Sequence, residues 1–318
     1  MINNLLLVLA YNEAVNIKKT IYELIDEFDK IIVINDASKD STQEILDQIQ
    51  NEHNKVSIIK NKKNFGAGKS FQIGLNYIVE KKLDPINIVK IDGDGQFKRF
   101  DILKVKKILE GNNVDYVKAN RFWSDGIVGD IPNIRYFGNS IASFLIKFNT
   151  GLFKINDPLN GLLGFKAKFI KHINIPKIFF RYGYPFYVNS SFIQNNLKTC
   201  EIQNVVRYGI GEMSQLKALP LFLKLIGYSV FYFFSNIKSK LKISDLQISA
   251  ILDITFTCFQ LFSFISLSIL MSIRYFERLG VQSNWFILFV IFQLFSFFNI
   301  YYSKSLENSV RKNLFTNY

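Results

Sequence analysis

Residues 86–96 read INIVKIDGDGQ, an apolar run that ends in two aspartates on a glycine-rich turn. The run has the pattern of a buried β-strand, and Asp92 and Asp94 follow it directly, one residue apart. Two carboxylates placed in this way can share one divalent cation, which usually keeps water ligands and bridges to substrate phosphates. An EF-hand loop would need a glutamate where Leu103 stands, so that kind of calcium loop is excluded. For this motif taken alone, an ordinary polar turn is an equally good alternative.

Short apolar runs alternate with helical patterns around this stretch. Strands are predicted at residues 5–9, 30–34, 56–59, 86–91 and 116–119, and helices at 15–28, 41–50, 69–81 and 100–109. A capping box, Ser41 to Glu44, begins the second of these helices. The alternation predicts a parallel sheet with helices on both faces, which binds its ligands at the carboxyl ends of the strands. Farther along the chain, helices are predicted at 134–148 and 185–194.

Three further polar clusters follow predicted strands. They are LAYNE at residues 9–13, DASKD at 36–40 and NFGAGKS at 64–70. The glycines of the last cluster would let backbone N–H groups approach an anion at a helix N-terminus. A P-loop would require glycine where Lys63 stands, so a P-loop NTPase is disfavoured. The cluster at 36–40, taken alone, is more simply a turn followed by a helix cap.

Together the four clusters resemble the family 2 inverting glycosyltransferases. The family patterns P-A-Y-N-E, D-D-x-S-x-D-x-T, N-x-G-x-G-x-A/S and D-x-D-x-Q correspond to residues 9–13, 35–42, 64–70 and 92–96. The resemblance implies an α/β, Rossmann-like nucleotide-sugar-binding domain of the GT-A type, with Mg²⁺ or Mn²⁺ held by Asp92, Asp94 and Gln96. It implies that the donor is bound by Ala10, Tyr11, Asn12, Glu13, Asp36, Gly66, Gly68, Lys69, Asp92, Gln96 and Arg207.

The remainder of the chain resembles one branch of that family, the polyisoprenyl-phosphate glycosyltransferases. The similar segments are residues 120–122, 135–140, 156–161 and 207–214. This resemblance implies that Arg121, Arg135 and Asn139 bind the acceptor phosphate. The catalytic residues that it implies are Asp94, Asp157, Arg121 and Arg135, with Asp157 acting as a base or as a second orienting group. One departure is Leu163, which stands where the branch has an arginine that contacts phosphate.

Charge and hydropathy indicate a membrane partner. The chain has 39 Lys and Arg against 26 Asp and Glu, and no nucleic-acid-binding motif accompanies the net charge of +13. We expect a cytoplasmic catalytic domain at 1–212, an amphipathic interfacial segment at 213–247 and a transmembrane hairpin at 248–303, with spans 248–273 and 281–303. A cytoplasmic tail would follow at 304–318, because lysines and arginines flank the hairpin. Two buried core helices are the alternative to the hairpin.

The resemblance implies transfer of a hexose from a UDP- or GDP-sugar to undecaprenyl or dolichyl phosphate, with inversion, at the cytoplasmic face of the membrane. Two other functions stay open: a membrane-anchored glycosyltransferase that extends a glycolipid or polysaccharide, and a non-catalytic nucleotide-sugar-binding membrane protein. Nucleic acid is not an expected partner, and a homo-oligomer is left open. Residue spacing does not identify the sugar or the base.

Overall fold

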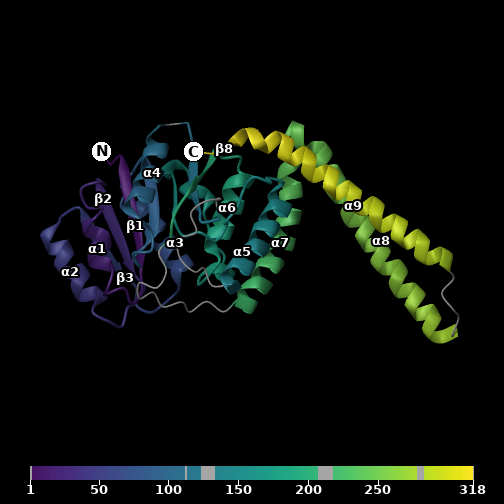
Figure 1. Cartoon of the computed structure of the whole chain (residues 1–318), viewed down its shortest axis with the longest axis horizontal. Coiled ribbons are helices and arrows are strands. Elements are labelled where there is room, and N and C mark those ends of the chain that lie inside the picture. The colour runs from purple at the N-terminus through teal and green to yellow at the C-terminus, as the bar shows by residue number, and fades with distance from the viewer. Residues whose placement is uncertain (1, 112, 123–132, 207–217, 278–282, 318) are drawn as a thin grey trace. The chain divides into compact units, whose positions relative to one another are not determined.

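The computed structural model describes residues 2–111, 113–122, 133–206, 218–277 and 283–317 (Figure 1). The chain forms two compact units. The sheet unit comprises residues 1–146, 154–228 and 314–318, and the hairpin unit comprises residues 147–153 and 229–313.

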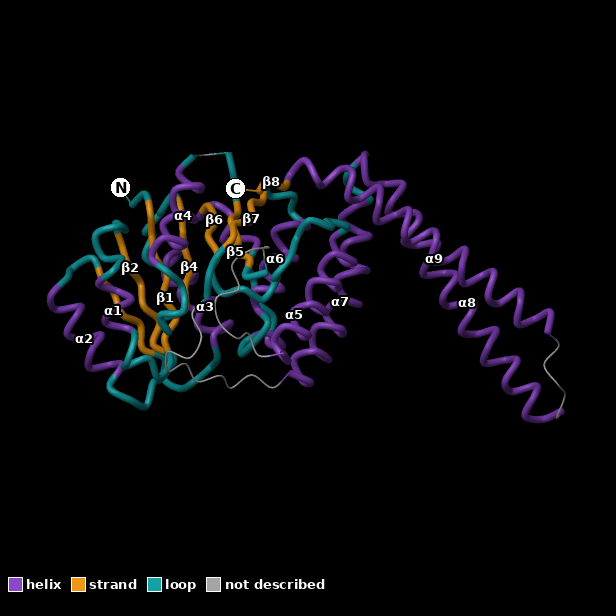
Figure 2. The backbone as a smooth tube through the Cα atoms, in the orientation of Figure 1, coloured by secondary structure: helices purple, strands orange, loops and turns teal. Residues whose placement is uncertain are grey.

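The sheet unit contains, among its described residues, one eight-stranded sheet in the order β3-β2-β1-β4-β6-β5-β7-β8 (Figure 2). The strands are β1 (Asn4–Ala10), β2 (Lys30–Asn35), β3 (Val56–Lys60), β4 (Asn87–Asp92), β5 (Tyr116–Asn120), β6 (Leu163–Lys166), β7 (Thr199–Gln203) and β8 (Phe315–Asn317). Neighbouring strands run parallel, except that β6 is antiparallel to both β4 and β5. The α/β class is therefore confirmed, whereas the wholly parallel sheet is wrong at β6.

The register brings the predicted polar clusters to one edge of the sheet. Leu9 of β1 lies opposite Asp92 of β4, and Ala10 lies opposite Asn35 of β2. Because β1, β2 and β4 are parallel, their carboxyl ends meet there, as expected for a ligand site in such a sheet.

Helices cover both faces of the sheet. The helices are α1 (Ile17–Tyr22), α2 (Thr42–Glu52), α3 (Ala67–Glu80), α4 (Arg99–Glu110), α5 (Asn133–Thr150) and α6 (Tyr184–Gln194). Apolar residues of α1, α2 and α4 share one buried core with alternate residues of the strands. On the other face, Phe71 of α3 and Phe192 of α6 both contact Phe165 of β6, with ring centroids 6.4 and 5.4 Å apart. This arrangement confirms the predicted cover on both faces.

The first predicted helix, at residues 15–28, is shorter in the structure and ends at Tyr22. The chain continues in turns, the first of which is closed by a hydrogen bond of 3.0 Å from the Leu24 backbone N–H to the Ile21 carbonyl. The turns still bury Leu24 and Phe28. The apolar periodicity therefore predicted the burial correctly and the helix length wrongly.

The capping box predicted at Ser41 is wrong, because the Ser41 side chain makes no capping hydrogen bond. The Asp40 carboxylate caps the first turn in its place and accepts a hydrogen bond of 3.1 Å from the Thr42 backbone N–H. Burial raises the pKa of Asp40, but the hydrogen bonds from Thr42 and from the Ala14 backbone outweigh burial and lower it.

The hairpin unit is built around α8 (Gln247–Glu277) and α9 (Ser283–Arg311), which lie side by side (Figure 1). The Phe259 and Phe292 rings meet edge to face at 4.6 Å, and Gln260 donates a hydrogen bond of 2.8 Å to Ser296. Large apolar side chains remain exposed at Leu261, Phe262, Ile265, Ile291, Leu294, Phe295, Phe297 and Phe298. An apolar surface of this extent is compatible with a lipid-facing hairpin.

Among the residues that the structure describes, two helical stretches, Pro220–Lys240 and Ser244–Ser263, are long and apolar enough to cross a membrane by length and composition. The second overlaps the predicted span 248–273. The first lies in α7 (Ala218–Lys240), which falls within the predicted interfacial segment 213–247. The interfacial placement of α7 stays a prediction.

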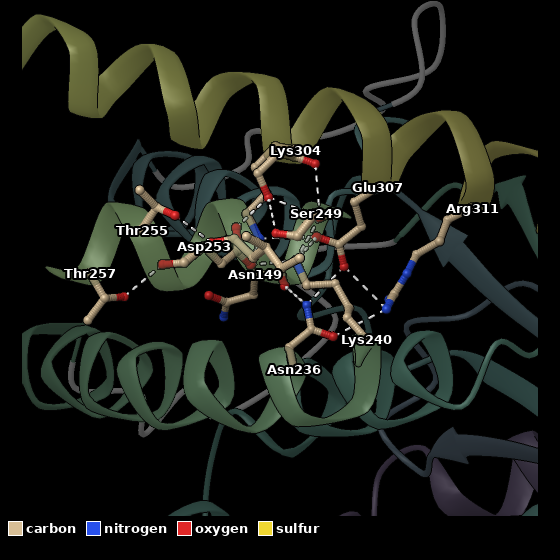
Figure 3. A network of polar contacts seen from close by, with 12 residues as sticks. Asn149, Asn236, Lys240, Ser249, Asp253, Thr255, Thr257, Lys304, Glu307 and Arg311 are labelled. Atoms are coloured by element: carbon tan, nitrogen blue, oxygen red, sulfur yellow. Dashed lines mark hydrogen bonds and ion pairs between the residues drawn. The ribbon is translucent and has the colours of Figure 1, made fainter. Parts of the chain in front are cut away.

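A network of buried charges joins α7, α8 and α9 within the hairpin unit (Figure 3). It consists of Lys240, Asp253, Lys304, Glu307 and Arg311, each at most 4% exposed. The Glu307 carboxylate lies 3.2 Å from Lys240 Nζ, 3.1 Å from Lys304 Nζ and 3.2 Å from Arg311 Nη2. Lys240 also pairs with Asp253. The network therefore ties the C-terminal end of α7 to both helices of the hairpin.

Candidate active site

A pocket lies at the carboxyl ends of β1, β2 and β4, beside the N-terminus of α3. Eight predicted site residues line it: Ala10, Tyr11, Asn12, Glu13, Asp36, Gly66, Asp92 and Asp94. Six residues that were not predicted as site residues also line it: Leu9, Asn64, Ala67, Ser70, Arg181 and Tyr182. Three of the four polar clusters contribute several lining residues, and the cluster at 36–40 contributes Asp36.

The loops after β1 and β2 are fastened to each other. The Asn12 backbone is left-handed, with φ +58°, and its N–H donates to Ser38 Oγ at 2.9 Å. Asn12 Oδ1 in turn accepts the Lys39 backbone N–H at 2.8 Å, and the Glu13 N–H donates to Thr42 Oγ1 at 2.8 Å. These bonds fix the backbone of residues 10–13 where it borders the pocket.

Asp36 connects the second cluster to the glycine-rich cluster. Its carboxylate accepts hydrogen bonds from Asn61 Nδ2 at 2.7 Å, from the Phe65 N–H at 2.9 Å and from the Gly66 N–H at 2.7 Å. Asp36 is only 4% exposed. Its main visible role is therefore to hold the loop before α3, while it also lines the pocket.

Asp36→Asn should lower the free energy of unfolding by about 1.5–3 kcal/mol. Three N–H donors bind the two acceptor oxygens of the Asp36 carboxylate, whereas the asparagine amide has only one acceptor oxygen. We would measure denaturant unfolding in detergent by circular dichroism. Asp26→Asn is the matched control, since Asp26 is 95% exposed in a 3.7 Å pair with Lys55. Equal stability of the two variants would contradict this role of Asp36.

Two glycines of the glycine-rich cluster allow another segment of the chain to pack closely against them, which was not predicted. A Cβ at Gly66 would collide with the backbone of residues 180–181, and a Cβ at Gly68 would collide with the Phe179 carbonyl. The Lys69 N–H donates to the Phe180 carbonyl at 2.9 Å. These glycines therefore admit a segment of this chain, and their approach to an anion stays a prediction. Neither Gly68 nor Lys69 is among the residues that line the pocket.

Asp92 and Asp94 both reach the pocket from the turn after β4. Gly95, with φ +73°, permits this turn, and Asp94 Oδ1 accepts the Gln96 N–H at 3.0 Å. The two carboxylates form a hard oxygen donor set, which fits Mg²⁺ or Mn²⁺ that completes its coordination with water and phosphate oxygens. The described residues contain no group of three or more His, Cys, Asp or Glu that could hold a metal without such outside ligands. Gln96 lies in the turn but does not line the pocket.

Lys90 is a residue of this site that the sequence analysis did not select. Its side chain is fully buried, and Nζ lies 2.7 Å from Asp92 Oδ1 and 3.1 Å from the Gly161 carbonyl oxygen. The ammonium also lies over the Tyr184 ring, 5.2 Å from its centroid. Lys90 therefore fixes one oxygen of Asp92 and balances its charge. A lysine inside an apolar strand was the available signal, because a buried ammonium requires a partner.

Arg121 and Asp157 form one closely bonded pair. Asp157 is fully buried and accepts hydrogen bonds from Arg121 Nε at 2.8 Å, Nη2 at 2.7 Å and backbone N at 2.9 Å. Burial raises the pKa of Asp157, but the charge and hydrogen bonds of Arg121 outweigh burial, so the pKa is lowered. A lowered pKa and saturated oxygens disfavour a general base. The geometry supports the other alternative, in which Asp157 orients Arg121.

The remaining predicted site residues, on the acceptor side and at Arg207 on the donor side, are placed only in part. Asn139 lies in α5 and is 4% exposed, and its Oδ1 has no hydrogen-bond partner among the described residues. Arg207 and the side chain of Arg135 fall outside the described residues. Leu163, which replaces the arginine of the branch pattern, is buried in β6. The structure therefore brings eight of the predicted site residues together at one pocket, and both donor binding and the acceptor-side grouping stay predictions.

Comparison with known proteins agrees with this geometry. The chain is 31% identical over 179 residues to the UDP-N-acetylglucosamine–dolichyl-phosphate N-acetylglucosaminyltransferase of Methanococcus voltae, covering 52% of this chain and 70% of that protein. It is 28% identical over 130 residues to a dolichyl-phosphate beta-glucosyltransferase of Trichomonas vaginalis, covering 37% and 38%. A mycobacterial protein of known structure shares the fold with a TM-score of 0.50 at 13% identity, covering 74% of each chain. Residues 6–173 match the model of glycosyl transferase family 2, and the chain belongs to that family.

Proposed function

We propose that this glycosyltransferase transfers a hexose from a UDP- or GDP-sugar to a polyprenyl phosphate, undecaprenyl or dolichyl, with inversion at the sugar. The observation that carries the proposal is the pair Asp92 and Asp94 in a pocket bordered by the loops that follow β1, β2 and β4, in a family 2 chain. The apolar hairpin of α8 and α9 supports a lipid acceptor. Relatives named for transfer to dolichyl phosphate support the same acceptor class.

On the donor side, each residue has a task that its position supports. Asp92 and Asp94 would hold Mg²⁺ or Mn²⁺, which neutralises the charge that develops on the departing nucleoside diphosphate. Gln96 supports the turn through its backbone bond to Asp94. The fastened backbone at 10–13 and the Asp36 loop would hold the base and ribose. Arg207 would stabilise the diphosphate as it leaves.

On the acceptor side, Arg121, Arg135 and Asn139 would orient the lipid phosphate for in-line attack on the sugar. A phosphomonoester has a second pKa of about 6 and is therefore largely dianionic at neutral pH, so it needs little help from a base. Asp157 holds Arg121 through the bonds of its buried carboxylate. Preorganisation of the arginine is thus the contribution that we assign to Asp157.

We propose that the sheet unit faces the cytoplasm and that the hairpin enters and leaves the membrane on that side. The chain after the hairpin returns to the sheet, because β8 pairs in parallel with β7. This pairing supports our proposal that both ends of the hairpin face the same side of the membrane as the sheet. The lysines and arginine near these ends, at Lys238, Lys240, Lys304 and Arg311, agree with a cytoplasmic placement. The return of residues 315–317 also means that the sheet extends beyond the predicted domain 1–212 and into the predicted tail 304–318.

The test is nucleoside diphosphate release from purified protein in vesicles, with a panel of UDP- and GDP-sugars and with or without undecaprenyl or dolichyl phosphate. Release that requires the polyprenyl phosphate, together with a sugar-phosphate lipid product, is the expected result. Nucleotide-sugar binding without release under any condition would favour the non-catalytic alternative. Release that requires a glycolipid or polysaccharide primer would favour the extending enzyme.

Arg135→Ala should weaken the use of the lipid phosphate by about 10- to 150-fold, since a charge-assisted hydrogen bond contributes about 1.5–3 kcal/mol. The loss is expected in the apparent affinity for polyprenyl phosphate or in turnover, while calorimetry with the nucleotide-sugar stays nearly unchanged. Arg99→Ala serves as the control, because Arg99 is half exposed and pairs with Glu27. If Arg135→Ala instead abolishes donor binding with the fold intact, Arg135 belongs to the donor pocket.

A further inference from the structure

We propose that Arg181 binds the diphosphate of the nucleotide-sugar and that the glycine-rich cluster at 64–70 serves to place it there. The inference rests on the proposed function and names a donor contact within the same pocket. Arg181 precedes α6 and lies more than one hundred residues after the glycine-rich cluster that it contacts.

The acidic residues of the pocket would repel a nucleoside diphosphate, and a cation beside them would reduce this repulsion. Its described lining residues include four acids, Glu13, Asp36, Asp92 and Asp94, and Arg181 is the one cationic side chain among them. Lys90 balances Asp92 from behind the lining, and a divalent ion on Asp92 and Asp94 would add further positive charge. Glu13 and Asp36 would still repel a nucleoside diphosphate. A guanidinium matches two phosphate oxygens at once, and such bidentate contacts are the stronger ionic hydrogen bonds.

The backbone at Arg181 is held from two sides. Phe179, just before it, is fully buried, and the Phe180 carbonyl accepts the Lys69 N–H at 2.9 Å. The approach is so close that a side chain at Gly66 would collide with Arg181 itself. Immediately afterwards Gly183, with φ +85°, turns the chain into α6. Arg181 is therefore fixed at the pocket by packing of its backbone.

The side chain is directed as well as the backbone. Arg181 Nη1 donates to Asn64 Oδ1 at 3.2 Å, and Asn64 also lines the pocket. A guanidinium carries five N–H donors in a planar fork, so this contact orients the group and leaves other donors for a ligand. Asn64 and Gly66, both from the glycine-rich cluster, thus position an arginine from a distant part of the chain.

A lipid phosphate presents the same chemistry as the donor diphosphate, and the pocket favours the donor. Arg181 lines the same pocket as Asp92 and Asp94, whereas the acceptor-side residues Arg121 and Asn139 do not line it. The experiment distinguishes the two sources by measuring both ligands separately.

The experiment compares wild type, Arg181→Ala and Arg181→Lys, as full-length protein in detergent or vesicles with Mn²⁺. Calorimetry measures UDP and GDP, and ligand-observed NMR measures uridine and guanosine, which lack the phosphates. Arg181→Ala should weaken binding of the preferred diphosphate about 10-fold or more and leave its nucleoside unchanged, because a charge-assisted contact of about 1.4 kcal/mol corresponds to one decade. Arg181→Lys should lose less, since it keeps the charge without the fork. Arg99→Ala should match wild type.

Three results would overturn the assignment. One is diphosphate affinity within twofold of wild type in Arg181→Ala, and another is equal loss of diphosphate and nucleoside, which would indicate a structural role. The third is unchanged diphosphate binding with a raised apparent KM for undecaprenyl phosphate, which would place Arg181 at the lipid phosphate. A different result would contradict the proposed function itself: wild-type protein that binds neither UDP nor GDP.

Discussion

Asp94→Asn should reduce sugar transfer by at least about 100-fold, because a metal ion that stabilises transition-state charge contributes several kcal/mol. Lys90 already balances the charge of Asp92 through a 2.7 Å ion pair. The group of Lys90, Asp92 and Asp94 therefore carries one net negative charge, and the substitution removes it. The turn should survive, since an asparagine oxygen can still accept the Gln96 N–H that Asp94 Oδ1 accepts at 3.0 Å.

The measurement is the rate of nucleoside diphosphate release at saturating Mg²⁺ or Mn²⁺, with circular dichroism to check the fold. EDTA should stop the wild-type reaction, and added Mn²⁺ should restore it. Transfer by Asp94→Asn at the wild-type rate, or a wild-type rate unaffected by EDTA, would show that the carboxylate pair does not hold a catalytic metal.

Much of the candidate pocket was predictable from sequence, because most of its lining residues lie at strand ends or in the polar clusters that follow them. Each polar cluster follows an apolar run, and parallel strands bring their carboxyl ends together, so adjacency in space follows from the pattern alone. The first five strands were accordingly placed to within one or two residues at each end. The predicted site residues Ala10, Asp36, Asp92 and Asp94 then meet at one pocket.

What the sequence did not predict depends on contacts between distant segments. The strands β6 and β8 have 4 and 3 residues, too short for a periodic pattern to mark them. β7 has 5 residues, as many as β3 and β5, so its length does not explain why it was missed. β8 pairs with β7, although the hairpin lies between the two strands in the sequence. A lysine inside a strand predicts that its ammonium has a buried partner, but the sequence does not identify that partner. For Lys118 the partner is Glu201, 2.6 Å away.

The glycine-rich cluster shows how a motif can be recognised while one of its physical uses is missed. Glycine was expected because an anion would approach the backbone, yet at Gly68 the approaching group is the Phe179 carbonyl. Both cases require the absence of a side chain, so the sequence cannot distinguish them. Only the fold shows that the segment before α6 occupies this position and carries Arg181 to the pocket.

Glu307→Gln should destabilise the hairpin unit by about 3–5 kcal/mol, the cost typical of removing one partner from a buried ionic network. Glu307 contacts Lys240, Lys304 and Arg311, all within 3.2 Å, and it is fully buried. Without its charge, three buried cations would face the single carboxylate of Asp253 (Figure 3). The glutamine could keep the 2.9 Å bond that Glu307 accepts from Asn236, so the loss reports mainly on charge.

Unfolding of the hairpin in bicelles, followed by steric trapping, measures this free energy. Asp245→Asn is the control, because Asp245 is an exposed acid near the start of α8. The double variant Lys304→Met/Glu307→Gln tests the mechanism, since it removes one cation together with the carboxylate and restores the original charge balance. Its loss should be smaller than the sum of the two single losses, by a coupling of about 0.5–3 kcal/mol. If the two losses simply add, Glu307 stabilises the helices by packing against Gly151 and its neighbours, and the charges of the network are not what holds α7, α8 and α9 together.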